Sequence, residues 1–240
     1  VATCDNTGVA RFGVTRETSI KLLRPGKPWL VLALTADLSG ATNRITGTLT
    51  EFKLSSIVAQ SDIKADRHHF NGTTSIVPAT YVKSYTARLK ARTSQGVGFT
   101  THDYPQGDGY LTFKVLANGS VSMSGKLADD TVVTMSGNLS QAKHWPIFQS
   151  LYLNKGCIAA DALLDDTQAD TDATAMNMLW FRPFQVVQWY PYGWDEGIYI
   201  DMLASKYTPS PATVFPGLNA TNSTTGNTDL PFTDGLLTSS

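Results

Sequence analysis

GYLTFKVLANGSVSMSGKLADDTVVTMSGNLS, from Gly109 to Ser140, is the stretch that decides the fold. Apolar side chains recur at every second position in three successive runs: Leu111, Phe113 and Val115, then Val121, Met123 and Leu127, then Val133, Met135 and Leu139. A period of two places alternate side chains on the same face of a β-strand. The pattern therefore predicts three strands, each with one buried face.

Two short polar segments connect these runs. Asn118-Gly119 is a strong hairpin signal, because both residues tolerate the positive φ angles of a type I′ turn. Asp129-Asp130 marks the next reversal of the chain. The stretch predicts an antiparallel meander in which Asn118 and Gly119 both have a positive φ.

Further strands are predicted on both sides of the meander. Those before it are Ala10–Thr15, Trp29–Leu38, Arg44–Glu51 and Tyr81–Thr93, separated by segments that contain Pro and Gly. After it, a strand begins at Trp145-Pro146, continues through Ser150-Leu151-Tyr152, and turns at Asn154-Lys155-Gly156 into a strand at Cys157. Residues Asp161–Met178 have some helical character, but their Asp-rich part, Asp165–Thr174, predicts an exposed loop with one helical turn at most.

Together these strands predict an all-β fold with little helix, in which antiparallel meanders form a sandwich or a barrel-like pair of lobes. The N-terminal lobe is assigned to residues 1–98 and the C-terminal lobe to residues 99–207. Residues 208–240 are nearly uncharged and rich in Pro, Thr and Asn, which predicts an extended arm or linker.

Composition bears on location and on partners. Only 16% of the residues are charged, and the formal net charge is -1. A low charge with abundant Thr, Ser, Gly and Asn is typical of extracellular β-proteins, so we expect the chain to be secreted or at the cell surface. Lys and Arg form no basic stripe, which argues against nucleic acid. No apolar run reaches the roughly 18 residues of a transmembrane helix, so we expect no membrane insertion.

The chain has two cysteines, Cys4 and Cys157. In an oxidising compartment they would close a long loop and anchor the N-terminal segment. A Cys4–Cys157 disulfide is therefore predicted, and two buried free thiols are the alternative.

Several short motifs follow one another in a fixed order: GDGYLTFKVLANGSVSMSGKLADDTVVTMSGNLS, HWPIFQSLYLNKG, LWFRP and YPYGWDEGIYI. In this order they resemble the repeating unit of very large secreted proteins predicted from Verrucomicrobia and related bacteria, which typically reads SG-x-LADGT, WP-x-x-x-SLY, K-G and W-x-K/R-P. The resemblance covers about Gly107 to Tyr207. Asp130 stands where the family more often has Gly, and Cys157 stands where a small residue is usual. The resemblance implies a secreted or surface β-module and carries over no catalytic residue.

Some residues could hold a metal ion. His68-His69 and His102-Asp103 offer imidazole and carboxylate groups, but their spacing matches no zinc motif. A second group could gather oxygen ligands for calcium, although it lacks the glycine and the terminal glutamate of an EF-hand loop: Asp165, Asp166, Asp170 and Asp172. We expect no metal site and no cofactor beyond weakly bound Ca²⁺.

Motifs of enzyme catalysis are also missing from the sequence. Ser150 has no sequence partner that would mark it as a nucleophile. The carboxylates of Asp195 and Glu196 could serve glycoside hydrolysis only at a suitable separation in space. We predict no catalytic residue.

The most aromatic stretch is LWFRPFQVVQWYPYGWDEGIY, residues 179–199. Exposed aromatic rings can stack on sugar rings, so Trp189, Tyr192 and Trp194 are candidate ligand-binding residues. The alternative is that the rings fill the core of a sandwich or barrel.

These observations predict an exported structural or adhesive β-module of the bacterial surface that is not an enzyme. Its expected partners are other copies of itself or neighbouring repeats, and a glycan. Self-association is assigned to the C-terminal arm, whose strand-like residues Leu230, Phe232 and Leu236 could join copies into a filament. A carbohydrate-binding module is the alternative function, and a secreted hydrolase is the third.

Overall fold

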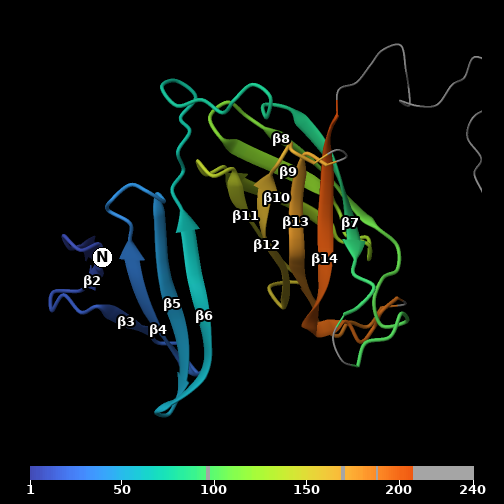
Figure 1. Ribbon diagram of the computed structural model, residues 1–240. Helices are drawn as coiled ribbons and strands as arrows, with labels where there is room; N and C mark the ends of the chain where they lie inside the picture. The colour runs from blue at the N-terminus through green and yellow to red at the C-terminus, as the bar shows by residue number, and fades with distance from the viewer. Residues whose placement is uncertain (96–97, 169–170, 188, 208–240) are drawn as a thin grey trace, which may run out of the picture. The chain divides into compact units, whose positions relative to one another are not determined.

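A computed structural model describes residues 1–95, 98–168, 171–187 and 189–207, and in these residues it contains strands and turns but no helix (Figure 1). The strands form three antiparallel sheets, which confirms the predicted all-β fold. Residues Val1–Tyr207 make one compact unit. The predicted arm, with Leu230, Phe232 and Leu236, lies outside the described residues.

The largest sheet has eight strands in the order β10-β9-β8-β7-β14-β13-β12-β11 (Figure 1). Apart from β10 and β11, strands that are consecutive in the sequence pair with each other, and β7 pairs with β14. The strands are β7 (Ser84–Ala91), β8 (Gly109–Val115), β9 (Ser120–Lys126), β10 (Val132–Asn138), β11 (His144–Leu151), β12 (Gly156–Leu164), β13 (Ala173–Arg182) and β14 (Trp194–Tyr207).

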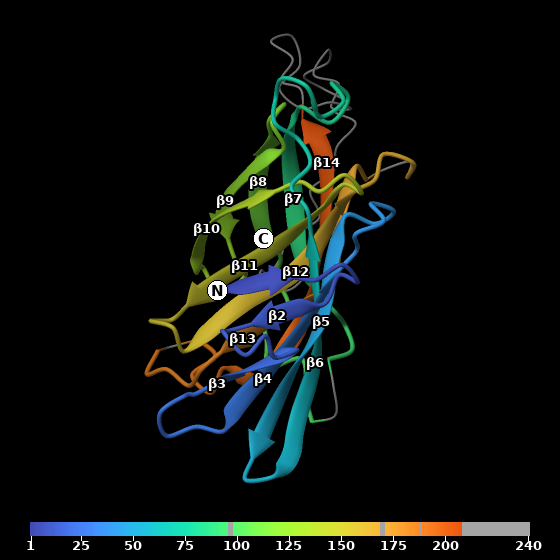
Figure 2. The same cartoon turned by 90° about the vertical axis from the view of Figure 1, so that its left-hand side faces the viewer.

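The outer strands of this sheet, β10 and β11, lie next to each other, so the sheet is nearly closed into a barrel (Figure 2). Side chains make the contact: the backbone N–H of Thr134 donates a hydrogen bond to Gln149 Oε1 at 2.9 Å. Gly137 faces Trp145, where an added Cβ would lie 3.3 Å from the indole Cδ1. The missing side chain at Gly137 thus lets the two edges approach.

The interior of the eight-stranded sheet is the main core. In β8, Leu111, Phe113 and Val115 are buried as the alternating pattern predicts. Tyr85 stacks on Phe113 with ring centroids 4.6 Å apart, and the centroids of the Phe113 and Trp145 rings are 5.6 Å apart. Each such ring removes about 150–250 Å² from water, which stabilises the fold by roughly 4–6 kcal/mol before entropy is counted.

The hairpin between β8 and β9 differs from the predicted turn. Gly119 has a φ of 83°, but Asn118 is not among the residues with a positive φ. The Gly119 N–H donates to Leu116 O at 2.9 Å, which closes a three-residue loop with a left-handed glycine at its end. The prediction of a positive φ at both positions is therefore wrong, since this longer loop requires it only at Gly119.

The Asp-rich loop lies between two strands. β12 continues to Leu164 and β13 begins at Ala173, so the described residues between them, 165–168 and 171–172, belong to the predicted loop, and the predicted helical turn is wrong for this described part. Ala162 and Leu164 point into the core and Asp161 is exposed, which is the alternation of a half-buried strand. The high Asp content concealed this pattern.

The second sheet has four strands in the order β3-β4-β5-β6: β3 (Ser19–Leu22), β4 (Trp29–Ala36), β5 (Arg44–Lys53) and β6 (Ser56–Asp66). A two-stranded sheet of β1 (Ala2–Cys4) and β2 (Ala10–Phe12) is linked to β4 by a bridge from Val9 to Thr35. The sheets divide between β6 and β7, whereas the first predicted lobe ran to residue 98 and included β7. The local pattern could not reveal that β7 pairs with β14, which comes much later in the chain.

Both cysteines are free, so the predicted Cys4–Cys157 disulfide is wrong. Cys4 lies in the two-stranded sheet, where its thiol donates to Gly8 O at 2.9 Å. Cys157 lies in β12, opposite Ser150 of β11 and Phe181 of β13. The spacing of two cysteines in a sequence does not reveal that they belong to different sheets.

Candidate interaction surfaces

One face of the four-stranded sheet is apolar. Residues directly opposite each other on paired strands share a face, and Leu32 of β4 lies opposite both Ile20 of β3 and Leu49 of β5. We call this the apolar face, and its apolar side chains are Ile20, Leu22, Leu30, Leu32, Leu34, Ile45, Leu49 and Ile63. Glu51, opposite Leu30, lies at one end of it and pairs with Arg24. The opposite face is more polar and carries Thr46, Thr48, Thr50, Gln60, Asp62 and Lys64, together with Trp29, Val31 and Phe52 at one end.

The apolar face is not fully covered by the described residues. None of its eight side chains is fully buried, and Leu22 and Ile45 are 36% and 41% exposed. In Val1–Asp66, which the structure describes completely, Phe12 is the only buried apolar residue. The eight-stranded sheet, by contrast, buries Leu111 and Val115 completely. The four-stranded sheet therefore lacks a core of its own in the described structure.

One edge of the same sheet is also free. β6 is the last strand of the sheet, and among the described residues only β5 forms backbone hydrogen bonds with it. Ile57 and Val58 on this strand are exposed, and so are Asp62 and Lys64. An edge strand presents unpaired N–H and C=O groups that can pair with another strand, and charged side chains restrain such pairing.

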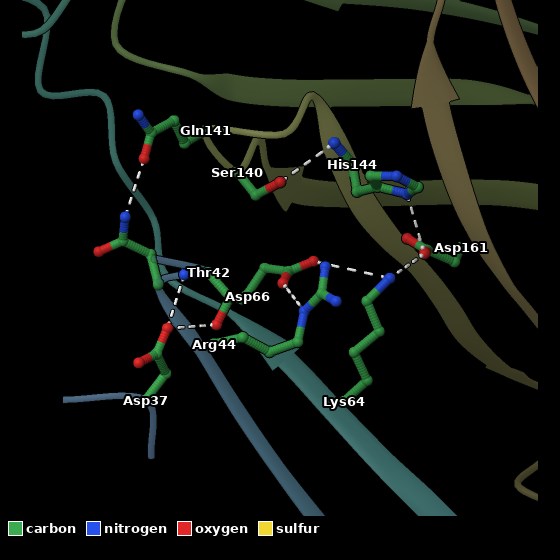
Figure 3. A network of polar contacts seen from close by, with 10 residues as sticks. Asp37, Thr42, Arg44, Lys64, Asp66, Ser140, Gln141, His144 and Asp161 are labelled. Carbon is green, nitrogen blue, oxygen red and sulfur yellow. Dashed lines mark hydrogen bonds and ion pairs between the residues drawn. The ribbon is translucent and has the colours of Figure 1, made fainter. Parts of the chain in front are cut away.

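The four-stranded sheet is connected to the eight-stranded sheet by polar contacts (Figure 3). Lys64 Nζ lies 3.3 Å from Asp161 Oδ2, and the same carboxylate oxygen lies 3.0 Å from His144 Nδ1. Asn43 Nδ2 donates to Gln141 Oε1 at 2.9 Å. Partly exposed ion pairs of this kind contribute about 0–1 kcal/mol each. Lys64 belongs to the opposite face, and none of these contacts involves a side chain of the apolar face.

An imidazole beside a carboxylate is also part of a catalytic triad, but the serine next to this pair has another role (Figure 3). Ser140 Oγ accepts a hydrogen bond from the backbone N–H of His144 at 3.1 Å. Ser150, which the sequence analysis considered as a nucleophile, donates a hydrogen bond from its hydroxyl to Asn154 Oδ1 at 2.8 Å. Both hydroxyl groups stabilise turns at the ends of β11.

The residues considered as metal ligands have protein partners. His68 Nε2 lies 2.9 Å from Asn118 O, beside the β8–β9 hairpin. Asp165 accepts hydrogen bonds from Thr167, and Asp166 accepts one from Tyr81. Asp172 pairs with Lys206 at 2.9 Å, and Asp170 lies outside the described residues. In the part of the chain that the structure describes, no three His, Cys, Asp or Glu side chains converge on a metal site.

The three aromatic candidates have different surroundings. Trp194 is only 1% exposed and packs edge-to-face on Trp180 at a centroid distance of 4.6 Å. Its assignment as a ligand-binding residue is wrong, because its indole belongs to the core. Trp189 and Tyr192 are 70% and 82% exposed in the connection between β13 and β14. These two rings are available to a ligand.

A buried ion pair supports this aromatic connection. Arg182 Nε lies 2.9 Å from Asp129 Oδ2, and the two side chains are 5% and 3% exposed. Arg182 also donates from Nη1 to Tyr190 O and from Nη2 to Trp189 O, the latter at 3.3 Å. The Tyr152 hydroxyl donates to Asp129 Oδ2 at 2.9 Å. The ion pair thus fixes the backbone that carries the exposed rings.

The sequence did not single out Asp129 and Arg182 as a pair. Both lie in segments that carry the family resemblance, the LADD run and the WFRP run. The sequence offered one signal for this pair: each of the two runs, otherwise made of structural residues, contains a charged residue, Asp129 in one and Arg182 in the other. Their contact could not be inferred, because Asp129 follows β9 and Arg182 ends β13.

Comparison of the chain with protein-family models, with curated proteins and with solved structures gave no match. Within the described residues, no helix has the length and apolar character needed to cross a membrane. A function for this chain has to be inferred from the surfaces described above.

Proposed function

We propose that this chain is an exported structural module and that the apolar face of its four-stranded sheet packs against the same face of a second copy. The observation that supports this most strongly is the contrast between the two sheets. The eight-stranded sheet encloses its own core, and the described residues do not fully cover the apolar face. A sheet with one hydrophobic face is stable when that face is buried against another element.

The size of the apolar face suits such a contact. Four strands about 4.8 Å apart, with roughly eight residues at about 3.3 Å each, give a face of about 500 Å². Exposed apolar patches of a few hundred Å² mark interaction sites on soluble proteins. Two copies together would bury about 1,000 Å², which is near the lower limit for a specific interface. Packed face to face, the two sheets would form a sandwich about 10 Å thick.

The free β6 edge supports a second, finer part of the proposal. The C-terminal arm of a neighbouring copy would add a strand there, with Leu230, Phe232 and Leu236 providing its apolar side chains. A face-to-face contact is symmetric and closes into a dimer, whereas an arm-to-edge contact runs head to tail and continues. The two contacts together would produce a filament.

Export and surface location rest on the low charge, the abundance of Thr, Ser, Gly and Asn, and the family resemblance. The two free thiols add no support, because they do not require an oxidising compartment. A structural role also agrees with serine hydroxyl groups that serve turns.

The test compares two substitutions on adjacent residues of β4. Leu32→Glu places a charge on the apolar face, and Ala33→Glu places the same charge on the opposite face. Light scattering after size exclusion should show that the wild-type chain and Ala33→Glu exceed the 26.0 kDa of a monomer as concentration rises, whereas Leu32→Glu, which keeps only the arm-to-edge contact, forms smaller species at the same concentration. Circular dichroism checks that both variants remain folded.

Two results would contradict the proposal. One is a wild-type chain that stays monomeric at all concentrations, and the other is folded Leu32→Glu that assembles like the wild type. Deleting residues 209–240 tests the arm separately. The truncated chain should form dimers but nothing larger than a dimer. If the truncated and complete chains have the same mass distribution, the arm is not part of the assembly.

A further inference from the structure

A cleft lies between two connections at one end of the eight-stranded sheet. One connection joins β7 to β8 and the other joins β13 to β14 (Figure 1). The cleft has a volume of about 530 Å³, within the usual range for small-molecule sites. Its described lining is Thr101, His102, Asp103, Gln106, Trp189, Tyr190, Pro191, Tyr192 and Gly193.

One wall of the cleft carries exposed aromatic rings. Trp189 and Tyr192 line it, and Phe184 lies 6.4 Å from the Tyr192 ring between centroids. All three rings are mostly exposed, although the same connection places Tyr190 against the buried Trp194 at 5.9 Å. The connection therefore separates rings that stabilise the fold from rings that face solvent.

The other wall carries polar groups. The Asp103 carboxylate accepts hydrogen bonds from the N–H and hydroxyl of Thr100 at 2.6 and 2.8 Å, which lower the pKa of Asp103 and keep it ionised. Gln106 Nε2 donates to Tyr104 O at 3.1 Å, and Tyr104 itself is buried. His102 completes this wall. Donors and acceptors thus line the same cleft as the aromatic rings.

The cleft is also preorganised on its aromatic side. Arg182 donates hydrogen bonds to the backbone carbonyls of Trp189 and Tyr190, and its guanidinium also forms the buried ion pair with Asp129. Gln185 N–H donates to Pro191 O at 2.8 Å across the same connection. Groups fixed before binding lose little conformational entropy when a ligand arrives.

We propose that this cleft binds a neutral oligosaccharide, with one pyranose ring stacked on Trp189 or Tyr192 and hydroxyl groups bonded to Asp103 and Gln106. A pyranose has an apolar C–H face and a rim of hydroxyl groups, which match the two walls. The described lining contains no Lys or Arg, and Asp103 is negative, so an anionic ligand is disfavoured. The site would make the structural module adhesive, a role that goes beyond assembly.

The test titrates the full chain with neutral hexasaccharides of β-1,4-glucose, β-1,4-xylose, β-1,4-mannose, β-1,3-glucose, α-1,4-glucose and N-acetylglucosamine by calorimetry. At least one should bind, and Trp189→Ala or Tyr192→Ala should weaken that binding tenfold or more. Phe148→Ala is the matched control, because Phe148 is an exposed aromatic residue on β11, outside the cleft. It should bind like the wild type.

The proposal is overturned if no hexasaccharide binds, or if both cleft variants bind as well as the wild type. Binding to neutral phosphatidylcholine vesicles that is lost in Trp189→Ala, without sugar binding, would identify a lipid surface and also overturn it. Repeating the titration with Leu32→Glu, which lacks the face-to-face contact, separates the two proposals. Sugar binding that persists in this variant would support the cleft whatever the outcome for assembly.

Discussion

Leu32 of β4 lies opposite Leu49 of β5 on the apolar face, and neither side chain is fully buried. In the eight-stranded sheet the comparable pair, Phe113 of β8 opposite Met123 of β9, is buried, with exposed fractions of 3% and 2%. Both pairs follow the same alternating rule, so the difference lies in what covers them. The chain thus combines a finished core with a sheet face that remains open in the described residues.

The ion pair of Arg182 and Asp129 should be essential for stability. Asp129→Asn would leave the Arg182 guanidinium buried without a counter-charge, which costs about 3–5 kcal/mol. Urea denaturation measures this loss as a lower midpoint.

The neighbouring Asp130 is a matched control. It forms an exposed pair with Lys126 and has a φ of 68°, which Asn also tolerates. Asp130→Asn should cost less than about 1 kcal/mol. If Asp129→Asn and Asp130→Asn lower the free energy of unfolding equally, the buried ion pair contributes no more to stability than the exposed one.

Gly119 should be the sensitive position of the β8–β9 hairpin. With a φ of 83°, an added Cβ would lie 3.0 Å from Phe70 Cβ, so Gly119→Val should destabilise the fold by roughly 1–3 kcal/mol. Gly107→Val, where no atom lies within 4 Å of the added Cβ, should cost less than about 0.5 kcal/mol. Thermal melts that rank the two variants in the opposite order would refute this assignment.

The two thiols should differ in reactivity. Cys4 is exposed, so reagents reach it directly. Burial raises the pKa of the Cys157 thiol, so below that pKa a smaller fraction of Cys157 is the reactive thiolate than in a cysteine with the ordinary pKa. Iodoacetamide at pH 8 should label Cys4 first, and the labelling of Cys157 should accelerate as pH rises. Intact mass spectrometry follows both steps. A native protein that takes no label until it is reduced would restore the disulfide.

Much of the larger sheet could be predicted from the sequence. Strong alternation in the β8–β10 meander predicted its strands and their buried residues, because one face of each strand meets a core. β6 was missed because its side chains are exposed along nearly the whole strand, so the sequence carries no alternation there. A strand sequence alternates between apolar and polar residues only where one face of the strand is buried.

The candidate sites were less predictable, because they depend on long-range contacts. Trp189, Tyr192 and Trp194 occur within six residues, and only the fold shows that Trp194 turns into the core while the other two face solvent. The polar wall of the cleft comes from the β7–β8 connection, which no local motif relates to the aromatic wall. The unpartnered apolar face was equally hidden, since a strand pattern indicates an apolar face but not what covers it.

The most direct test of the proposed assembly is methyl NMR of the wild-type chain with a soluble nitroxide as a paramagnetic probe of solvent contact. The methyl groups of Leu32 and Leu49 report on the apolar face, and the methyl group of Ala33 reports on the opposite face. At a concentration where the chain is monomeric, the nitroxide should broaden the leucine signals. On concentration into the assembled state, that broadening should decrease for Leu32 and Leu49 and stay constant for Ala33. Leucine signals equally broadened in both states would contradict the account, because the apolar face would then remain in contact with water.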